Sequence, residues 1–395
     1  MTRLRKASAR QAAGLLGRKL GHSLSPQIHR FFGDYEYRLY EKEPEEVGRF
    51  LRTGFANGDF DFLNVTIPYK QTVFALCDEL SPMARKLGNV NFVTRTADGK
   101  LRGDNTDAFG VGRLLDANRI DVRGWNCAIL GAGGAAMTVK AVLEERGAKR
   151  VTFVRRGEDP AQDDDLIVNA TPVGMFPDVD GVRVDISQYV RGKAVLDLVY
   201  NPSPTRLVRE AQACGKIAAD GMVMLIAQAY RAFQLAFGTK HRTPGTLFLY
   251  GPPASGKSTW AKRIAAATGW APVDLDAEIV KAEGRSIPEI FAAEGEKGFR
   301  EAEKRCLTSV CGDETSPPQG GRVIALGGGA LLDSESRKIA GMSGRVVVLD
   351  CPIETLKKRL TGGDRPLSAD AAKLEALVKA RAAHYASFAN HVEMI

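Results

Sequence analysis

Two glycine-rich turns, far apart in the chain, each follow an apolar run and precede a helix-forming segment. The first is Gly131-Ala-Gly-Gly-Ala-Ala136, directly after Cys127-Ala-Ile-Leu130. The second is Gly251-Pro-Pro-Ala-Ser-Gly-Lys-Ser-Thr259, directly after Leu247–Tyr250. A strand that runs into such a turn and then into a helix directs backbone N–H groups at a phosphate. We therefore expect an α/β fold with two separate phosphate-binding sites.

Length and composition allow several globular domains. The chain has 395 residues, of which 44% are hydrophobic, and contains no apolar run long enough to span a membrane. Six scattered cysteines without a CxxC pair favour reduced thiols and a cytoplasmic location. The formal charge of +8 is spread along the chain, so we expect small anionic substrates and no nucleic-acid or membrane partner, and leave the oligomeric state open. A motif already begins at Gly21, so the basic first ten residues are taken as mature chain.

The upstream turn has the spacing of a dinucleotide-binding fingerprint. Its expected cofactor contacts are Gly131, Ala132, Gly133, Gly134 and Ala135. The next strand, 150–154, ends in Arg155-Arg156, where an NAD site would carry an acid. Two guanidiniums suit a 2′-phosphate, which favours NADP(H); a solvated basic turn is the alternative.

The downstream turn matches the P-loop pattern. We expect Lys257 to contact the phosphates of ATP and the Ser258 hydroxyl to face Mg²⁺. The expected nucleotide contacts are Gly251, Ser255, Gly256, Lys257, Ser258 and Thr259. Farther on, 273–276 is expected to end a strand and 298–303 to open a helix.

Arg381 falls on the apolar face of a helix predicted around 371–389. A guanidinium in an apolar stripe needs an anion, which indicates a carboxylate pocket; the alternative is that it reaches solvent or pairs within the protein.

Three polar clusters border apolar runs in the first part of the chain: 21–26, 64–70 and 103–107. Taken singly, each is often only a turn or a helix cap. Together they supply hydroxyls, amides, a lysine and a carboxylate, a set that suits a polyhydroxylated ligand.

The segments SLSP, NVTIPYK, GNVN, GDNTD, GAGGAA, NATPVGM and DGMVMLIAQ occur in the order seen in shikimate dehydrogenases, and residues 14–238 resemble that family. The resemblance implies a substrate-binding lobe at 1–105 with 221–238 and a Rossmann NADP-binding lobe at 106–220. It implies that Lys70 and Asp107 form the catalytic dyad. Substrate would be held by Ser23, Ser25, Asn64, Thr66, Asn91, Gln228 and Tyr200, with Met224 beside the nicotinamide.

The chain departs from this family at several points. Asn89 and Val223 stand where alanine and glycine are common, and only Arg156 aligns directly with the family's arginine. Few residues separate Arg156 from the next strand, 166–169, which predicts the loss of the usual crossover helix. The adenosine end of the cofactor site is therefore expected to differ.

Beyond a polar linker at 239–245, residues 246–395 resemble shikimate kinase, a P-loop domain with a parallel sheet. The resemblance implies that Asp276 positions the attacking hydroxyl, that Asp274 assists Mg²⁺ alongside Ser258, and that Arg365 meets the γ-phosphate from a lid. The ring and carboxylate of shikimate would be held by Arg300, Gly327, Gly328, Gly329 and Arg381. The chain departs at Ala254, where a glycine is common, and it stops in the expected last strand. Two expectations follow for this end: either ATP binding is weaker, or the fold compensates.

The two halves together predict a bifunctional enzyme that reduces 3-dehydroshikimate with NADPH and then phosphorylates shikimate with ATP and Mg²⁺. Two alternatives stay open. One is a quinate/shikimate dehydrogenase that uses NAD, fused to the same kinase. The other is a catalytically impaired sensor of pathway metabolites.

Overall fold

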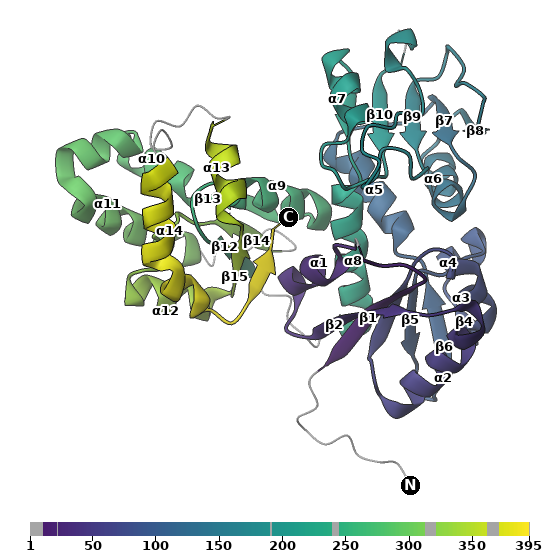
Figure 1. Cartoon of the computed structure of the whole chain (residues 1–395), viewed down its shortest axis with the longest axis horizontal. Helices are drawn as coiled ribbons and strands as arrows, with labels where there is room; N and C mark the ends of the chain where they lie inside the picture. Colours follow the sequence, from purple (N-terminus) through teal and green to yellow (C-terminus); the bar gives the residue numbers. More distant parts are fainter. Residues whose placement is uncertain are drawn as a thin grey trace. The chain divides into compact units, whose positions relative to one another are not determined.

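The structure, a computed structural model, describes residues 11–21, 23–189, 192–238, 245–312, 321–361 and 371–394 (Figure 1). The chain divides into an N-terminal unit of residues 1–29 and 35–238 and a C-terminal unit of residues 239–395, with which residues 30–34 are grouped. Of the predicted linker, only Gly245 lies within the described residues.

The N-terminal unit begins with a mixed sheet. Its strands are β1 (Ala12–Gly17), β2 (Glu36–Glu41), β3 (Phe62–Val65), β4 (Glu79–Leu80), β5 (Phe92–Arg95) and β6 (Leu101–Asp104). They lie in the order β2-β1-β3-β5-β6-β4, and only β5 runs antiparallel to its neighbours. The accompanying helices are α1 (Ser25–Phe32), η1 (Pro44–Glu46), α2 (Val47–Asn57), α3 (Lys70–Leu76) and α4 (Pro82–Leu87).

A parallel sheet follows in the same unit. Its strands are β7 (Asn126–Leu130), β8 (Arg150–Val154), β9 (Leu166–Asn169), β10 (Ala194–Asp197) and β11 (Ile217–Ala219), in the order β11-β10-β9-β7-β8. Its helices are α5 (Asp107–Ala117), α6 (Gly134–Glu145), η2 (Ile186–Gln188), α7 (Arg206–Ala213) and α8 (Met222–Phe237). The order reverses between β9 and β7, and the glycine turn follows β7, which is where such sheets bind ligands.

The inner strands of this second sheet, β7, β9 and β10, are buried on both faces, as is typical of parallel strands, whereas the edge strands β8 and β11 are partly exposed. Along β7, Cys127 and Ile129 join the core on one face, while Ala128 and Leu130 join the core on the other. No helix connects β8 to β9, which confirms the predicted loss of the crossover helix.

Helices α5 and α8 pack closely between the two sheets (Figure 1). A side chain at Gly110 would lie 2.8 Å from the carbonyl oxygen of Met224, so glycine is needed at this crossing. The close contact fixes the start of α5 beside α8, and both helices carry predicted site residues.

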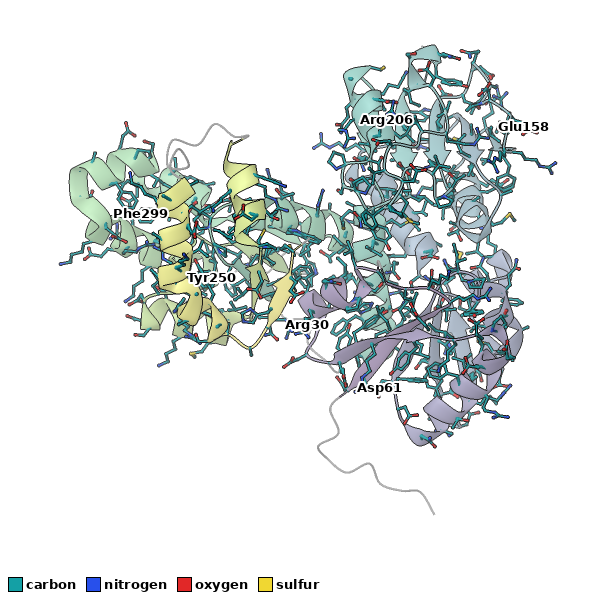
Figure 2. The ribbon with its side chains drawn as sticks, viewed as in Figure 1. Arg30, Asp61, Glu158, Arg206, Tyr250 and Phe299 are labelled. Atoms are coloured by element: carbon teal, nitrogen blue, oxygen red, sulfur yellow. The ribbon has the colours of Figure 1, made fainter. Side chains whose placement is uncertain are left out.

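The C-terminal unit contains one parallel sheet. Its strands are β12 (Thr246–Tyr250), β13 (Ala271–Asp274), β14 (Arg322–Ala325), β15 (Arg345–Asp350) and β16 (His391–Glu393), in the order β13-β14-β12-β15-β16. Its helices are α9 (Lys257–Thr268), α10 (Leu275–Glu283), α11 (Ile287–Gly312), α12 (Ser334–Ser343), α13 (Ile353–Thr361) and α14 (Ala371–Ala386). Tyr250 and Phe299, labelled in Figure 2, belong to the core of this unit. The predicted α/β class with parallel sheets is confirmed.

One predicted boundary is wrong. Asp276 does not end a strand, because the Asp274 carboxylate caps the next helix and places Asp276 in the first turn of α10. The helix predicted to open at 298–303 is the second of two helical segments in α11, which are divided by a kink at Gly295, where φ is 68°, so it begins slightly before residue 298. Among the described residues, no helix combines the length and apolar character needed to cross a membrane.

Candidate active sites

Lys70 and Asp107 form an ion pair at the start of two helices. Lys70 Nζ donates to Asp107 Oδ2 at 2.6 Å, and the side chains are only 18% and 10% exposed. Asp107 opens α5, where the helix dipole stabilises a carboxylate. A lysine and a carboxylate paired in such a largely desolvated place are able to supply a proton and a partner charge to a ligand.

A buried network of amides and hydroxyls lies beside this ion pair. Asn64 donates to the carbonyl of Asn91 at 3.5 Å, and Asn91 Oδ1 accepts from the Thr106 amide at 2.6 Å. Asn91 Nδ2 donates to Thr106 Oγ1 at 3.0 Å, and that hydroxyl lies 3.5 Å from Gln228 Oε1. The structure thus brings the predicted residues Asn64, Asn91 and Gln228 together through Thr106. Thr66, the remaining predicted residue of the 64–70 cluster, is half-buried directly after β3.

A second cluster adjoins Asn64. The Ser23 and Ser25 hydroxyls lie 3.1 Å apart at the start of α1, and Tyr37 on β2 donates to Asn64 Oδ1 at 3.0 Å. Burial raises the pKa of Tyr37, although a hydrogen bond with Ser25 opposes the shift, so the phenol stays protonated. Asn64 Oδ1 accepts from Tyr37, and one hydrogen of Nδ2 is directed at the Asn91 carbonyl, which leaves the second Nδ2 hydrogen as a further donor.

The His29 ring packs against the ring of Tyr37. The two rings stack with centroids 4.0 Å apart, and His29 Nδ1 lies 2.6 Å from the Tyr35 hydroxyl. Burial lowers the pKa of His29 to about 3, against the opposing effect of a hydrogen bond with Asn64. The imidazole is therefore neutral, and it packs as an aromatic ring.

Asn89, which departs from the family pattern, has a structural partner. Its Oδ1 accepts from Asn105 Nδ2 at 2.6 Å, and Asn105 Oδ1 accepts from the Asp107 amide at 3.0 Å. Asn89 is 2% exposed, so an alanine there would leave a buried amide of Asn105 without this acceptor. Asn89 thus orients the Asn105 side chain, whose Oδ1 accepts from the first amides of α5, the helix that carries Asp107.

The upstream glycine turn can accept a pyrophosphate. Gly131 has φ of 103°, and a Cβ on it would lie 2.9 Å from the Thr171 side chain, so only glycine fits. Cβ atoms on Gly133 and Gly134 would meet open space, and α6 begins at Gly134 without a side-chain cap. The free N–H groups and open approach fit a dinucleotide phosphate. Arg155 and Arg156 are exposed directly after β8.

Tyr200 and Met224 lie after β10 and at the start of α8. Tyr200 follows β10 and is half-buried, which raises the pKa of its phenol. The loop before it is braced by Asp197, whose carboxylate accepts from Asn169 Nδ2 at 2.9 Å and from Thr205 Oγ1 at 2.7 Å. Met224 lies in the first turn of α8, against Gly110.

The P-loop wraps around the Lys257 ammonium. Lys257 Nζ donates to the Gly251 and Pro252 carbonyls at 3.0 and 2.8 Å, and Ser255 is fully buried. Positive φ angles of 132° at Gly251 and 92° at Gly256 shape the loop. Ala254 also adopts a positive φ, of 61°, where a glycine would be unstrained. Thr259 follows in the first turn of α9.

Ser258 and Asp274 form a pair suited to Mg²⁺. Ser258 Oγ donates to Asp274 Oδ2 at 2.7 Å. Mg²⁺ prefers hard oxygen ligands and commonly takes one or two from protein and the rest from phosphates and water. No cluster of three or more metal-ligating side chains occurs in the described ranges, and the hydroxyl–carboxylate pair fits this sparse mode of binding.

Charged groups surround the three glycines 327–329. A Cβ on Gly327 would lie 2.5 Å from Glu303 Oε1 and 3.4 Å from Asp276 Oδ1, and one on Gly329 would lie 2.6 Å from Arg300 Nη2. Arg381 Nη1 donates to the Gly328 carbonyl at 3.0 Å. The structure therefore brings Asp276, Arg300 and Arg381 to one glycine segment.

Glu303 is a site residue that the sequence did not reveal. Its Oε2 accepts from Arg300 Nη1 at 2.6 Å, its side chain is 4% exposed, and its Oε1 has no hydrogen-bond partner among the described residues. Burial raises the pKa of Glu303, and the Arg300 guanidinium opposes the shift. The available signal was its position three residues after Arg300 on a helix.

Four further groups were missed. Thr106 lies inside a recognised cluster, whereas Tyr37 gave no signal beyond an ordinary strand. Tyr385 donates to the Gly328 carbonyl at 2.7 Å, and Arg359 Nη1 donates to the Ser255 carbonyl at 3.4 Å. Arg365 lies outside the described residues.

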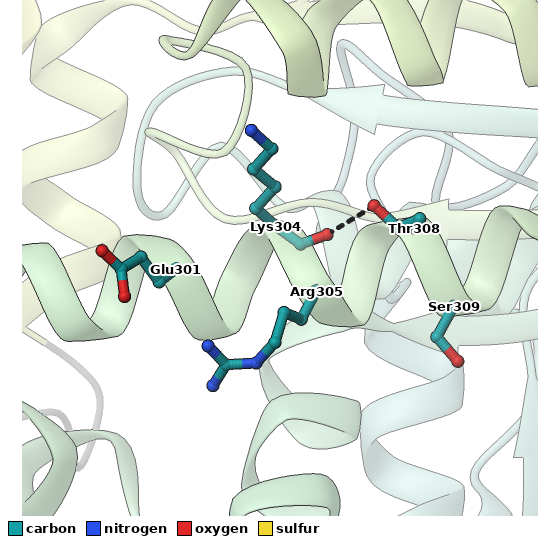
Figure 3. Close-up of a pocket in the computed structure, with 5 residues that line it drawn as sticks. All are labelled: Glu301, Lys304, Arg305, Thr308 and Ser309. Atoms are coloured by element: carbon teal, nitrogen blue, oxygen red, sulfur yellow. Dashed lines mark hydrogen bonds between the residues drawn. The ribbon is translucent and has the colours of Figure 1, made fainter.

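An open hollow of about 560 Å³ lies along α11 (Figure 3). It is lined by Glu301, Lys304, Arg305, Thr308 and Ser309. Lys304 pairs with Glu335, and Arg305 pairs with Glu283 at 2.9 Å. Because both cations already have carboxylate partners, we assign no ligand to this hollow.

Two family models match the chain. The shikimate dehydrogenase substrate binding domain matches residues 15–93, and shikimate kinase matches residues 253–394.

Relatives of known name match the N-terminal part. Shikimate dehydrogenase (NADP(+)) of Clostridium beijerinckii is 35% identical over 245 residues, which is 56% of this chain and 90% of that protein. The enzyme of the same name from Methanopyrus kandleri is 38% identical over 261 residues, covering 57% and 89%.

Solved structures agree with this match. A chorismate mutase/shikimate 5-dehydrogenase fusion protein from Clostridium acetobutylicum has a TM-score of 0.55 at 32% identity, covering 58% of this chain and 92% of that one. Shikimate 5-dehydrogenase from Thermus thermophilus, in complex with NADP(H) and shikimate, has a TM-score of 0.53 at 32% identity, covering 58% and 94%. The chain belongs to the shikimate dehydrogenase family through its N-terminal unit, and it carries a shikimate kinase domain in its C-terminal unit.

Proposed function

We propose that the chain catalyses two consecutive reactions on one molecule. The N-terminal unit reduces 3-dehydroshikimate to shikimate with NADPH, and the C-terminal unit transfers a phosphoryl group from ATP to shikimate. The observation that carries the proposal is the shielded Lys70–Asp107 ion pair, bordered by hydrogen-bonding amides. This arrangement suits proton transfer to a polyhydroxylated substrate.

The reduction needs one proton at one atom. NADPH supplies the hydride to the carbonyl carbon when it is bound. The carbonyl oxygen then gains negative charge, and the Lys70 ammonium donates a proton to it, which leaves a hydroxyl. Asp107 holds the Lys70 ammonium in place at 2.6 Å and accepts a hydrogen bond from a neighbouring substrate hydroxyl.

The remaining groups of this unit orient the substrate. Ser23 and Ser25 hold the carboxylate, and the ring hydroxyls bind Asn64, Thr66, Asn91 and Gln228. Tyr200 and Met224 close the site on the cofactor side. The division into a substrate-binding lobe at 1–105 with 221–238 and a cofactor lobe at 106–220 belongs to the same proposal.

The cofactor assignment is supported by the open glycine turn and the two exposed guanidiniums. The pyrophosphate would lie on the turn Gly131–Ala135 and bind its N–H groups from Ala132 onward, because the Gly131 amide already donates to the Val154 carbonyl; the 2′-phosphate would bind Arg155 and Arg156. NADP(H) is favoured over NAD for this reason.

Phosphoryl transfer depends on positioning and on neutralising charge. We propose that Asp276 accepts the proton of the attacking hydroxyl, while Arg300 and Arg381 hold the carboxylate and Gly327–Gly329 pack against the ring. Lys257 and Arg365 contact the phosphates, and Ser258 and Asp274 hold Mg²⁺, which neutralises phosphate charge when bound. The other nucleotide contacts come from Gly251, Ser255, Gly256 and Thr259, within a kinase domain at 246–395.

A coupled assay tests the proposal. Purified full-length protein is given 3-dehydroshikimate, NADPH and MgATP, and we expect NADPH oxidation together with ADP and a phosphorylated product. Each omission separates the steps: without ATP the product is shikimate, and without NADPH neither product forms. Absence of both turnovers in folded protein would favour a metabolite sensor. A higher kcat/KM for quinate with NAD⁺ than for shikimate with NADP⁺ would replace the proposal with the quinate reading.

A further inference from the structure

The connection between β8 and β9 contains turns in place of a helix. A parallel connection normally covers its sheet face with a helix. Here a segment from later in the chain, residues 182–189, covers part of that face. Val184, Ile186 and Tyr189 are buried in the same core as Leu130 and Val154.

This covering segment also brings Arg183 to the end of β8. Arg183 Nη2 donates to the carbonyl of Arg155, and it lies 3.4 Å from the carbonyl of Glu158. The turn is closed by the Glu158 amide, which donates to the Arg155 carbonyl at 3.0 Å. Arg183 therefore lies on the turn that carries Arg155 and Arg156; Glu158, labelled in Figure 2, marks its far side.

The turn adjoins the dinucleotide-type glycine turn. The Gly131 amide donates to the Val154 carbonyl at 3.0 Å, which joins the start of the glycine turn to the last residue of β8. In a Rossmann sheet, the group that follows this second strand faces the adenosine ribose. Arg183 thus reaches the ribose end of the site from a distant part of the chain.

Three arginines share this turn, since Arg183 contacts the backbone that carries Arg155 and Arg156. In the ranges that the structure describes, no carboxylate forms an ion pair with any of the three. Glu158, on the same turn, accepts instead from the Arg155 amide at 2.8 Å through its Oε2. Arg183 uses Nη2 for the backbone, and a guanidinium has further N–H groups to offer.

We infer that Arg183 is a specificity-determining residue that helps to bind the 2′-phosphate of the cofactor. It takes this part because the segment that replaces the crossover helix delivers it to the Arg155–Glu158 turn. The inference rests on the proposed NADPH-dependent reduction and adds a residue to its cofactor site. A purely structural role would be to brace the turn, which would affect cofactors with and without a 2′-phosphate alike.

Binding of cofactor fragments separates these roles. Adenosine 2′,5′-bisphosphate carries the 2′-phosphate and AMP lacks it, and calorimetry with the full-length protein measures both. For Arg183→Ala we expect the Kd of the bisphosphate to rise about tenfold, and that of AMP to change less than twofold. Arg183→Lys should recover part of the difference, because it keeps the charge without the planar fork.

Arg209→Ala is the matched control. Arg209 is an exposed arginine of the same lobe that also donates to a backbone carbonyl, that of Pro204, at 3.0 Å. It should leave both Kd values unchanged. Steady-state KM values should agree: Arg183→Ala raises KM for NADPH and leaves those for NADH and 3-dehydroshikimate in place.

Two outcomes overturn the inference alone. Equal weakening of the bisphosphate and AMP would show that Arg183 only braces the turn, and no weakening would remove it from the site. Failure of the unmodified protein to prefer the bisphosphate over AMP would instead reject the NADP(H) assignment, and the role of Arg183 with it.

Discussion

The two units surround their candidate ligands with different chemistry. In the N-terminal unit, one ion pair, Lys70–Asp107, lies beside neutral amides and hydroxyls that hydrogen-bond one another. In the C-terminal unit, Arg300, Asp276 and Glu303 lie where side chains on Gly327 and Gly329 would otherwise be, and Arg381 donates to the Gly328 carbonyl. One pocket is mostly neutral, whereas the other is densely charged.

The difference follows from the proposed reactions. Hydride transfer to a ketone creates a single negative charge, which one proton removes. Phosphoryl transfer brings several negative oxygens together, and cations must neutralise them throughout. A small cyclic acid can thus be bound by either kind of pocket, and the chemistry decides which kind is built.

The largest expected effect separates the two lysines. Lys70→Ala should lower kcat of reduction by about 10²–10⁴-fold because the proton donor is lost, and should leave phosphorylation unchanged. Lys257→Ala should lower phosphorylation by about 10²–10³-fold and spare reduction. The two reactions are assayed separately on each purified variant. A loss of both activities from either substitution, in folded protein, would contradict independent sites.

The next effect tests the charged pocket. Glu303→Gln removes the buried carboxylate that orients Arg300, so KM for shikimate in phosphorylation should rise about tenfold. Glu296→Gln is the matched control. Glu296 also pairs with Arg300, with Oε1 3.3 Å from Nη2, but its side chain is 69% exposed. It should change KM less than twofold. Equal changes in KM for the two variants would mean that the burial of Glu303 does not contribute to shikimate binding.

A smaller effect tests the neutral pocket through pH. The pKa of His29 falls to about 3 in the folded chain from an ordinary value of 6.5. Between these values the unfolded chain binds the extra proton, so stability is complete above pH 6.5 and is lost as pH falls. The temperature of half-inactivation of reduction should therefore drop by up to about 2–4 °C per pH unit on this account.

His29→Asn should flatten this dependence, measured as the difference from the unmodified protein at each pH. His391→Asn, which changes a histidine of the C-terminal unit, should keep the original slope. Identical slopes for His29→Asn and the unmodified protein would show that His29 is not the titrating group.

The smallest effect concerns the P-loop backbone. Ala254→Gly relieves a positive φ, so the C-terminal unit should gain about 0.5–1 kcal/mol of stability, after the entropy that glycine adds to the unfolded chain. The half-inactivation temperature of phosphorylation measures this. Ala265→Gly, inside α9, should lower it by a similar amount. A loss of stability in Ala254→Gly would mean that the strain at this alanine is not real.

Much of the architecture was predictable from local pattern. Strands at 150–154 and 166–169 were predicted with the bounds that the structure gives, and the lost crossover helix followed from the short spacing between them. Asp276 was misplaced because a capping carboxylate two residues earlier turned a strand end into a helix start. Arg381 was found by its place on an apolar helix face, but the Gly328 carbonyl that it contacts was not.

By itself the sequence determined the two glycine turns, their order in the chain and the backbone N–H groups that they direct at a phosphate. It could do so because the conformation of such a turn depends on local backbone sterics, which the spacing of glycines sets. Tertiary structure decided which distant side chains meet. It brought Lys70 into contact with Asp107, and Asn89 into contact with Asn105 at the start of α5. It also brought Arg183 to the carbonyl of Arg155, 28 residues earlier in the chain. These contacts depend on how whole strands and helices pack, which no short stretch of sequence specifies.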